Sequence, residues 1–386
     1  MSRVQCVGVH RIACRDPADL GGVRAMVEAG AIDPAEIVAV LGKTEGNGCV
    51  NDFTRDLAAH AWCTYLAGCL GCSPQAVEAR VALVMSGGTE GVLSPHFTVF
   101  TRRWVDAGLP GPAGDDLAGD PPTKRLVVGI SRTRPLLPEE LGRRAQIDAT
   151  AGAVRDAMRD AGIDTCADVH FVQVKCPLLT IERIAAARAR ATDTVTRDVY
   201  ASMAWSRAAS SLGVALALDE VGGLAADALE RAVMRDFTLH SNRASASAGI
   251  ELDANVVVVF GEARGARSPY RIAHTVMRDA IDAASVRRLL ATAFDLDPDE
   301  ARDAVRRRLV NLFAKAEADP GGTVAGARHT MLDDSDIHAT RHARAAAGAV
   351  LASVVGDTAL YVSGGAEHQG PPGGGPVAMV LRTAPR

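Results

Sequence analysis

One pattern of elements occurs three times along the 386 residues of this chain, and this internal repeat is what most constrains its fold. Each copy opens with an apolar stretch typical of a strand, continues into a helical stretch, and reaches a second apolar strand that ends on a lysine. These lysines are Lys43, Lys175 and Lys315. Since a repeated unit buries its apolar face against its neighbours, the pattern predicts three similar units packed together.

The expected elements fall at corresponding places in the three copies. The opening strands are residues 4–13, 125–130 and 270–276, and the first helices lie near residues 20–29, 146–161 and 280–294. The second strands are residues 37–43, 169–175 and 310–315, and the last strands are residues 97–101, 256–260 and 377–381. This alternation predicts an α/β fold of three homologous repeat units around a pseudo-three-fold axis, with the active site at the centre.

The boundaries of the units follow from the repeat and from local composition. We expect unit A at residues 1–105, unit B at residues 122–265 and unit C at residues 266–386. Residues 108–123, between the first two units, are rich in proline and glycine, which is typical of a linker.

A short serine motif of the form S-[GA]-G-x-E precedes the last strand of every copy, at residues 86–90, 247–251 and 363–367. Ser245 lies close to the second motif but does not fit its form. A small residue after the serine lets backbone N–H groups approach a ligand closely. The motif therefore supplies candidate binding groups at Ser86, Gly87, Ser247, Ala248, Ser363 and Gly364.

Each copy also has a helix that begins near an arginine, between the lysine and the serine motif. These arginines are Arg55, Arg207 and Arg344. Arg341 competes in the third copy, but we favour Arg344 because the Arg-Ala-Ala that begins there matches the context of Arg207. The planar guanidinium offers a fixed pair of donors for carbonyl oxygens.

Lysine is scarce, since only four of the 42 basic residues are lysine and three of them end the repeated strands. Lysine can lose its proton in a protein, whereas arginine stays charged. Three sets of lysine, serine and arginine around one axis predict a pocket that includes Lys43 and Lys315. The ligand that suits such a pocket is small, polar, rich in carbonyl groups and close to three-fold symmetric.

Only one of the three serine–lysine dyads is needed to break one bond. The two outer lysines are each followed, two residues later, by an acid, Glu45 or Glu317, whereas Lys175 has no carboxylate nearby in the sequence. A lysine near other cations and without a counter-ion is more easily deprotonated. This favours Lys175 as the base and Ser247 as the nucleophile.

Residues 366–376 are too rich in glycine and proline for a helix or a strand. Carbonyl groups of such a loop can face inward and, together with a carboxylate such as Glu317, surround a hard divalent cation. The sequence therefore offers a candidate metal site near the third lysine.

Charge and hydropathy exclude several classes of protein. A net charge of −4 without a basic stripe argues against nucleic acid as a partner. The longest apolar runs are strand-sized, such as residues 255–260, and the N-terminus lacks the pattern of a signal peptide, so we expect no membrane association. Cys69 and Cys72 form a C-x-x-C without a second pair, which argues against structural zinc. We expect a cytoplasmic enzyme with reduced cysteines.

Four long segments resemble the cyanuric acid hydrolase/barbiturase family of cyclic amide hydrolases, and the similarity extends over essentially the whole chain. The segments are GKTEGNGCVNDFTR at residues 42–55, MSGGTEGV at 85–92, FVQVKCPLL at 171–179 and YVSGGAEHQG at 361–370. One departure from the family is Arg243, where smaller residues are usual.

The resemblance implies hydrolysis of cyanuric acid to 1-carboxybiuret, which then loses carbon dioxide to give biuret. Carried over by motif, Ser247 is the nucleophile, Lys175 is its base, and the arginines and serine-motif residues named above bind the ring. The resemblance also implies a homotetramer without an organic cofactor. It implies a structural Mg²⁺ or Ca²⁺ held by Glu317 and the carbonyl groups of Ala366, Gln369, Gly370, Pro371 and Gly374.

Three other interpretations stay open. A barbiturase would open barbituric acid to ureidomalonate with the same site. A non-catalytic binding protein would keep the repeat but lose Lys175 or Ser247, and both are present. An amidase-signature hydrolase also pairs serine with lysine, but it needs a Gly/Ser-rich segment with a second serine, which is not evident here.

Overall fold

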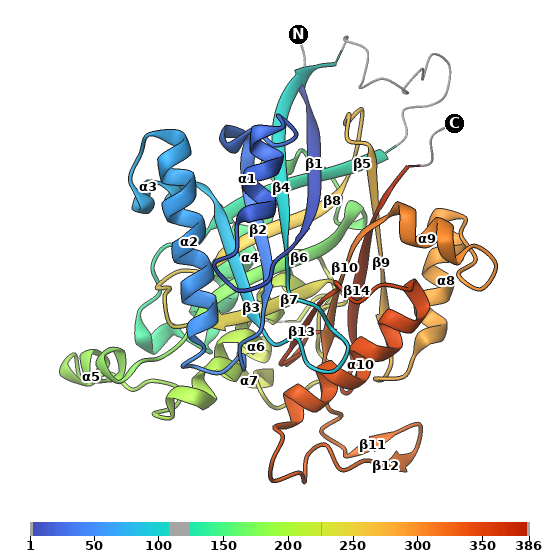
Figure 1. Cartoon of the computed structure of the whole chain (residues 1–386). Coiled ribbons are helices and arrows are strands. Elements are labelled where there is room, and N and C mark those ends of the chain that lie inside the picture. Colours follow the sequence, from blue (N-terminus) through green and yellow to red (C-terminus); the bar gives the residue numbers. More distant parts are fainter. Residues whose placement is uncertain (1–2, 108–123, 225, 384–386) are drawn as a thin grey trace.

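The computed structural model describes residues 3–107, 124–224 and 226–383, and its three four-stranded sheets each come from one third of the chain (Figure 1). The first sheet contains β1 (Arg3–Ala13), β2 (Ile37–Thr44), β3 (Ala82–Gly87) and β4 (His96–Asp106). The second contains β5 (Lys124–Arg132), β6 (Val169–Pro177), β7 (Ala244–Gly249) and β8 (Val256–Arg264). The third contains β9 (Tyr270–Met277), β10 (Leu309–Ala316), β13 (Tyr361–Gly364) and β14 (Gly375–Arg382). A small hairpin is formed by β11 (Thr323–Val324) and β12 (Ala327–Arg328).

Helices cover one face of each sheet. The helices that do so are α1 (Gly21–Glu28), α2 (Phe53–Leu70), α3 (Pro74–Arg80), α4 (Arg144–Ala161), α6 (Val199–Ala217), α8 (Ala283–Phe294), α9 (Arg302–Arg308) and α10 (Ala339–Val355). Two further helices lie outside these layers: α7 (Ala226–Ala232) packs on α4, and α5 (Ile181–Ala189) projects from the body of the molecule (Figure 1). None of the helices in the described residues is long and apolar enough to cross a membrane.

The three sheets share one topology, with the strand orders β1-β4-β2-β3, β5-β8-β6-β7 and β9-β14-β10-β13. In each sheet the two strands that carry the lysine and the serine are parallel, and the other neighbours are antiparallel. Even a register irregularity near the start of the lysine strand recurs in all three. The α/β fold of three repeat units is therefore confirmed. The unit boundaries stay a prediction, and linker residues 108–123 lie outside the described residues.

The face of each sheet that carries no helices packs into one central apolar cluster, to which all three sheets contribute. Five aromatic rings of this cluster lie in contact across the units: Phe100, Phe171, Phe260, Phe313 and Tyr361. Separate apolar clusters fill the space between each sheet and its own helices. Because the sheets share a core, they close around a common centre rather than forming independent domains.

Phe313 lies at the middle of this cluster, since its ring contacts four aromatic neighbours from all three units. Phe313→Ala is expected to lower the free energy of unfolding by about 3–5 kcal/mol, because it removes buried area and leaves a cavity. Phe53→Ala is the matched control, since the Phe53 side chain is 76% exposed, and it is expected to change stability by less than about 0.5 kcal/mol. Equilibrium unfolding in urea measures both, and similar values for the two variants would contradict the shared core.

Candidate active site

Each repeated lysine lies directly opposite the motif serine of its own unit. The register of the parallel strands pairs Lys43 with Ser86 and Lys175 with Ser247. The third pair, Lys315 and Ser363, obeys the same register. Side chains at paired positions of neighbouring strands leave the sheet on the same face, so the register places each amine and the hydroxyl of its unit on one side of the sheet.

All three lysines are buried, with at most 1% of their surface exposed. Lys43 Nζ donates to Ser86 Oγ and to the Gly87 carbonyl, both at 3.3 Å. Lys315 Nζ donates to Ser363 Oγ at 3.2 Å and to the carbonyl oxygens of Ala246 and Gly364. Burial, together with Arg207, lowers the pKa of Lys315 to about 7, and burial with Arg344 holds the pKa of Lys43 well below its ordinary value.

Lys175 has different partners. Its Nζ donates to the Met85 carbonyl at 3.1 Å and forms an ion pair with Glu251 at 3.2 Å. Within the described residues no hydrogen bond joins Lys175 to Ser247. Burial lowers the pKa of Lys175, and the carboxylate of Glu251 opposes that shift. The expectation of a lysine without a counter-ion is wrong, because a carboxylate 76 positions later in the chain folds back onto it.

The two acids that follow the outer lysines in the sequence do not pair with them. No ion pair joins Lys43 to Glu45 or Lys315 to Glu317 in the part of the chain that the structure describes. The distribution of carboxylates is therefore the reverse of what the local sequence indicates.

The three serines meet near the centre of the molecule. Ser86 Oγ donates to Ser363 Oγ at 3.3 Å, and Ser247 Oγ lies 3.3 Å from the same atom. Ser86 and Ser363 are buried, whereas Ser247 keeps partial exposure. Of the three hydroxyls, that of Ser247 is the most accessible from the pocket.

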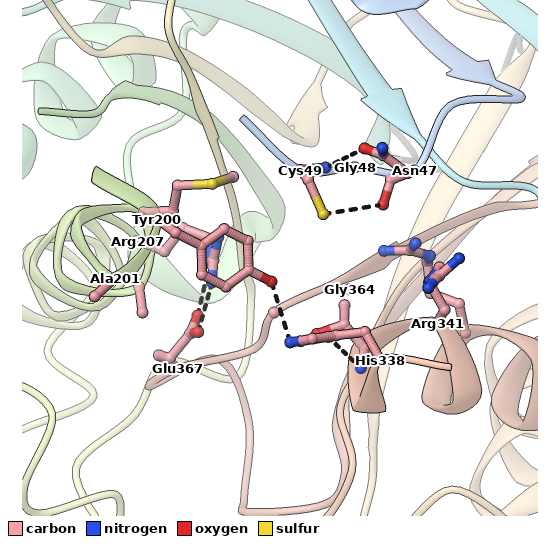
Figure 2. A pocket seen from close by; sticks show the side chains of 15 residues that line it. Asn47, Gly48, Cys49, Tyr200, Ala201, Arg207, His338, Arg341, Gly364 and Glu367 are labelled. Atoms are coloured by element: carbon pink, nitrogen blue, oxygen red, sulfur yellow. Dashed lines mark hydrogen bonds and ion pairs between the residues drawn. The ribbon is translucent and has the colours of Figure 1, made fainter. Parts of the chain in front are cut away.

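Two of the three arginines bind the glutamate of the serine motif in the next unit. Arg207 donates through Nε and Nη2 to both carboxylate oxygens of Glu367, at 2.8 and 2.6 Å (Figure 2). Arg344 binds Glu90 through the same two nitrogens. These bidentate pairs fix the guanidinium planes. The motif glycine beneath Arg344 is Gly88, at a φ of 106°, where an added Cβ would lie 2.5 Å from the guanidinium.

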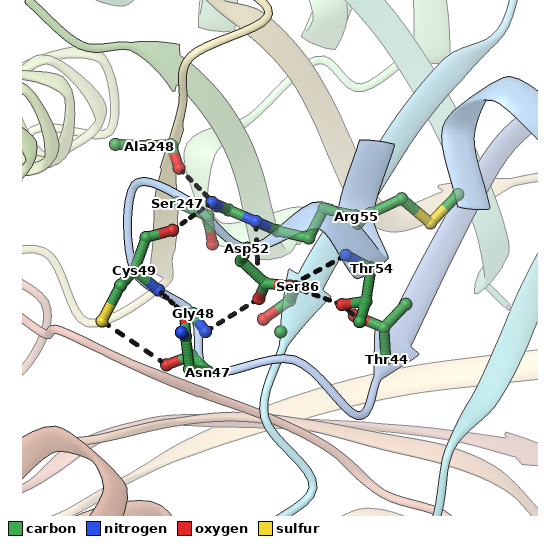
Figure 3. Close-up of polar contacts among 12 residues, drawn as sticks. Thr44, Asn47, Gly48, Cys49, Asp52, Thr54, Arg55, Ser86, Ser247 and Ala248 are labelled. Atoms are coloured by element: carbon green, nitrogen blue, oxygen red, sulfur yellow. Dashed lines mark hydrogen bonds and ion pairs between the residues drawn. The ribbon is translucent and has the colours of Figure 1, made fainter. Parts of the chain in front are cut away.

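Arg55 departs from this arrangement. Its Nη1 donates to the Ala248 carbonyl at 3.0 Å and its Nη2 to the Cys49 carbonyl, while Nε lies 3.7 Å from Asp52 (Figure 3). By symmetry its partner would be Glu251, but in the described residues that carboxylate pairs with Lys175. The arginine–glutamate pair is therefore missing only for the motif glutamate of unit B, whose serine, Ser247, is the least buried of the three.

One pocket collects nine of the sequence-predicted binding residues. Its walls include all three arginines, all three serines and the small residue after each serine: Arg55, Ser86, Gly87, Arg207, Ser247, Ala248, Arg344, Ser363 and Gly364. The three lysines lie behind this wall, and among the described residues Lys43 and Lys315 bond to serines that line it.

The pocket adjoins a cavity of about 160 Å³ that shares Gly48 and the guanidinium groups of Arg207 and Arg344 with it (Figure 2). Tyr200 on α6 and His338 at the start of α10 line this cavity and are joined by a 3.1 Å hydrogen bond between Oη and Nε2. All three units line this cavity, since Asn47, Gly48 and Cys49 of unit A complete its wall.

Sequence reasoning missed the loop of residues 45–52, which closes the pocket on the side of unit A. Asp52 holds this loop by accepting hydrogen bonds from the Gly48 and Thr54 N–H groups at 2.8 and 3.1 Å, and it caps α2 (Figure 3). The motif glutamates were also left without a role, although each was visible as the last letter of the repeated S-[GA]-G-x-E.

Glu317 lies beside the glycine-rich loop, as a metal site would require. Burial and the nearby carboxylate of Glu367 raise the pKa of Glu317 to about 8, and the structure shows no hydrogen bond or ion pair for it within the described residues. Glu317 lines a small cavity with Gly373 and Gly374. A carboxylate without a partner beside backbone carbonyl groups fits a hard cation. No cluster of three or more His, Cys, Asp or Glu side chains occurs in the described residues, so backbone oxygens would complete the set.

A three-unit α/β fold whose lysines, serines and arginines meet at one pocket belongs to the hydrolases of cyclic amides. The chain matches the family described as amidohydrolase ring-opening protein over residues 8–382, and it is a member of that family. The family membership expected from the sequence motifs is thereby confirmed.

Relatives agree over almost their full length. The cyanuric acid amidohydrolase of Bradyrhizobium diazoefficiens is 57% identical over 381 residues, which are 98% of this chain and 99% of the relative. The cyanuric acid amidohydrolase of Pseudomonas sp. (strain ADP) is 56% identical over 380 residues, 97% of this chain and 99% of the relative. A solved cyanuric acid hydrolase superposes with a TM-score of 0.89 at 56% identity, covering 98% of this chain and all of that one.

Asp52→Ala is expected to destabilise the protein by about 2 kcal/mol, because it removes a helix cap and leaves the Gly48 N–H without its acceptor. Asp198→Ala is the matched control, since Asp198 caps α6 through the Ala201 N–H, and we expect a loss of about 1 kcal/mol. Chemical denaturation measures both variants. An Asp52 variant no less stable than the Asp198 variant would show that Asp52 does not anchor the loop.

Proposed function

We propose that this protein hydrolyses cyanuric acid to 1-carboxybiuret, which loses carbon dioxide to give biuret. The observation that carries the proposal is the pocket itself, where a serine, an arginine and a buried lysine recur three times around one axis. Cyanuric acid has three equivalent carbonyl groups, and its three-fold symmetry matches that of the donors. The relatives named for this substrate, at 57% and 56% identity, support the same choice.

Ser247 is the nucleophile and Lys175 the base in this proposal. Ser247 is the least buried of the three serines and faces Lys175 in the register of β6 and β7. Neutral Lys175 accepts the hydroxyl proton as Oγ forms a bond to a ring carbonyl carbon. The C–N bond then breaks, and Lys175 returns the proton to the leaving ring nitrogen. Water attacks the acyl group, and the proton it loses passes through Lys175 to Oγ as the product leaves.

The arginines hold the ring and stabilise the oxyanion. The Nε and Nη2 edges of Arg207 and Arg344 are occupied by glutamates. Arg344 lines the pocket, and its Nη1 forms no hydrogen bond within the described residues, so this nitrogen is left for the ring. A donor fixed in this way needs no reorganisation when negative charge develops on the carbonyl oxygen.

Ser247→Ala is expected to lower kcat on cyanuric acid at least about a thousand-fold, because it removes the attacking atom. Ser86→Ala and Ser363→Ala are matched controls that delete the same hydroxyl in the other units, and we expect higher KM with a much smaller loss of kcat. Loss of ring absorbance measures turnover.

The same assay with barbituric acid tests the neighbouring activity. Barbituric acid carries CH₂ in place of one ring N–H, so one unit would lose its match, and we expect cyanuric acid to be the better substrate. Turnover of barbituric acid alone would assign ureidomalonate formation to the same site. Binding of a ring without turnover of either would overturn the enzymatic proposal.

We also propose that Glu317 and the carbonyl groups of residues 366, 369–371 and 374 hold a structural Mg²⁺ or Ca²⁺, which would neutralise the Glu317 carboxylate and stiffen the loop behind Ser363. One of these cations is expected to raise the Tm of the protein above its value in EDTA, because a ligand of the native state stabilises it. Glu317→Gln is expected to abolish this difference, whereas Glu300→Gln, at an exposed acid of the same unit, keeps it. A Tm unaffected by either cation would refute the site.

The family resemblance further leads us to propose a cytoplasmic homotetramer, whose mass size-exclusion chromatography with light scattering would measure.

A further inference from the structure

The carboxylate of Glu251 occupies a different position from its two counterparts. Glu90 and Glu367, the same letter of the repeated motif, each bind an arginine of the neighbouring unit through two hydrogen bonds. Glu251 instead lies 3.2 Å from Lys175 Nζ. The motif glutamate thus has two alternative positions in this molecule. In units A and C it pairs with an arginine of the neighbouring unit, and in unit B it pairs with the lysine of its own unit.

The backbone of the motif differs in the same place. Gly88 and Gly365, the third motif residues of units A and C, have positive φ values of 106° and 72°. Gly249 instead continues β7, paired with Pro177. An added Cβ at Gly249 would lie 2.3 Å from the Glu251 carboxylate, whereas one at Gly365 would meet Arg207. The glutamate therefore folds over its own motif in unit B, in the space that an arginine occupies in unit C.

In this arrangement Glu251 opposes the loss of a proton from Lys175. Burial lowers the pKa of Lys175, but the neighbouring carboxylate stabilises the ammonium form and opposes that shift. The amine donates to Glu251 and to the Met85 carbonyl, and among the described residues it forms no hydrogen bond to Ser247. Moving the carboxylate away would therefore favour the neutral amine that the dyad proposed above needs.

We propose that Glu251 is a positioning residue that controls the charge of Lys175 by exchanging between two partners, the ammonium of Lys175 and the guanidinium of Arg55. The inference rests on the proposed role of Lys175 as the base. When Glu251 is paired with Lys175, the lysine stays protonated and the dyad is inactive. When Glu251 is paired with Arg55, as Glu90 and Glu367 are paired with their arginines, Lys175 is a buried amine without a counter-ion. Lys175 then releases one proton to water, and its lone pair is free for the hydroxyl of Ser247.

Glu251 is placed to make this exchange. About 30% of its side chain is exposed, against 1% for Lys175, and it lines an open cleft of about 580 Å³ between α3 and the loop before β8. The charged groups around the pair are few. Arg55 acts on Lys175, Asp56 acts on Glu251, and Glu78, Arg132 and Asp253 line the cleft. The Cys176 thiol, next in the strand, lies on the opposite face of the sheet, in the apolar cluster beneath the helices. Besides Lys175, Arg55 is the cation whose charge lowers the pKa of the Glu251 carboxylate.

The scarcity of lysine allows a direct test. In protein labelled with ¹³C at lysine Cε, the chemical shift of each of the four lysines reports its protonation. The signal of Lys175 is identified by its loss in Lys175→Arg. Glu251→Gln is expected to lower the titration midpoint of Lys175 by about one pH unit or more, because the neutral amide cannot stabilise the ammonium. Glu90→Gln removes the equivalent carboxylate of unit A and is expected to leave that midpoint in place.

The acid limb of kcat/KM measured on the same variants separates this inference from the proposed function. In Glu251→Gln we expect the acid limb of the kcat/KM profile to move to lower pH by the same amount as the Lys175 midpoint. In Glu90→Gln we expect the acid limb to stay in place and KM to rise. An unchanged Lys175 midpoint in Glu251→Gln, or an equal shift in both variants, overturns the role of Glu251. A shifted midpoint with an unmoved acid limb supports that role and overturns Lys175 as the base.

Arg55→Met tests the exchange itself. The Lys175 midpoint is expected to rise for two reasons: the carboxylate, without its second partner, stays on Lys175, and the guanidinium charge that lowers the pKa of Lys175 is gone. A midpoint equal to that of the unchanged protein would overturn the exchange. Unaltered signals of Lys43 and Lys315 in Glu251→Gln and Arg55→Met show that the fold is retained. In Glu90→Gln, whose carboxylate acts on Lys43, the signal of Lys315 serves this purpose.

Discussion

The rest of the structure depends on the apolar core that the three sheets share. Each sheet has helices on one face only, so its other face is excluded from water only if the sheets close on one another. That closure brings together the lysine ends of three strands that are far apart in the sequence. The polar groups of the pocket are held by the packing of rings such as Phe100, Phe260 and Phe313 some distance away.

The shared core also imposes an electrostatic problem. Three lysines and three arginines converge on one small volume, and burial disfavours every charged amine there. Each unit contributes one motif glutamate in compensation, and two of these neutralise arginines. The third motif glutamate, Glu251, forms an ion pair with Lys175 instead. The pairing of the glutamates therefore decides which lysine can serve as a base, because a carboxylate that pairs with one cation does not stabilise the charge of another.

A three-fold repeat suits a three-fold ligand, yet chemistry requires one unit to differ. The difference in this protein is local: an alanine follows Ser247 where glycine follows the other serines, β7 continues to Gly249, and Ser247 alone keeps partial exposure. None of these changes disturbs the sheet topology, which is identical in all three units. In the proposed mechanism, symmetric binding and catalysis by one unit can therefore coexist, because the sheets are alike and the serine motifs differ.

The sequence by itself determined the repeat, the α/β class, the expected strands and first helices, and nine residues of the pocket wall, because a pattern copied three times reports its own equivalent positions. Gly48, Met85 and Met203, which lie outside that pattern, complete the wall. It also singled out the buried lysines, since arginine had replaced lysine elsewhere apart from Lys124, which pairs with Asp168 at the surface. Only the tertiary structure decided which carboxylate meets which cation. Glu45 and Glu317 are close to lysines along the chain but pair with none of them in the described residues, whereas Glu251 reaches Lys175 from the loop between β7 and β8. Ion pairs form between neighbours in space, and the order of the sheets, not the order of the chain, sets those neighbours.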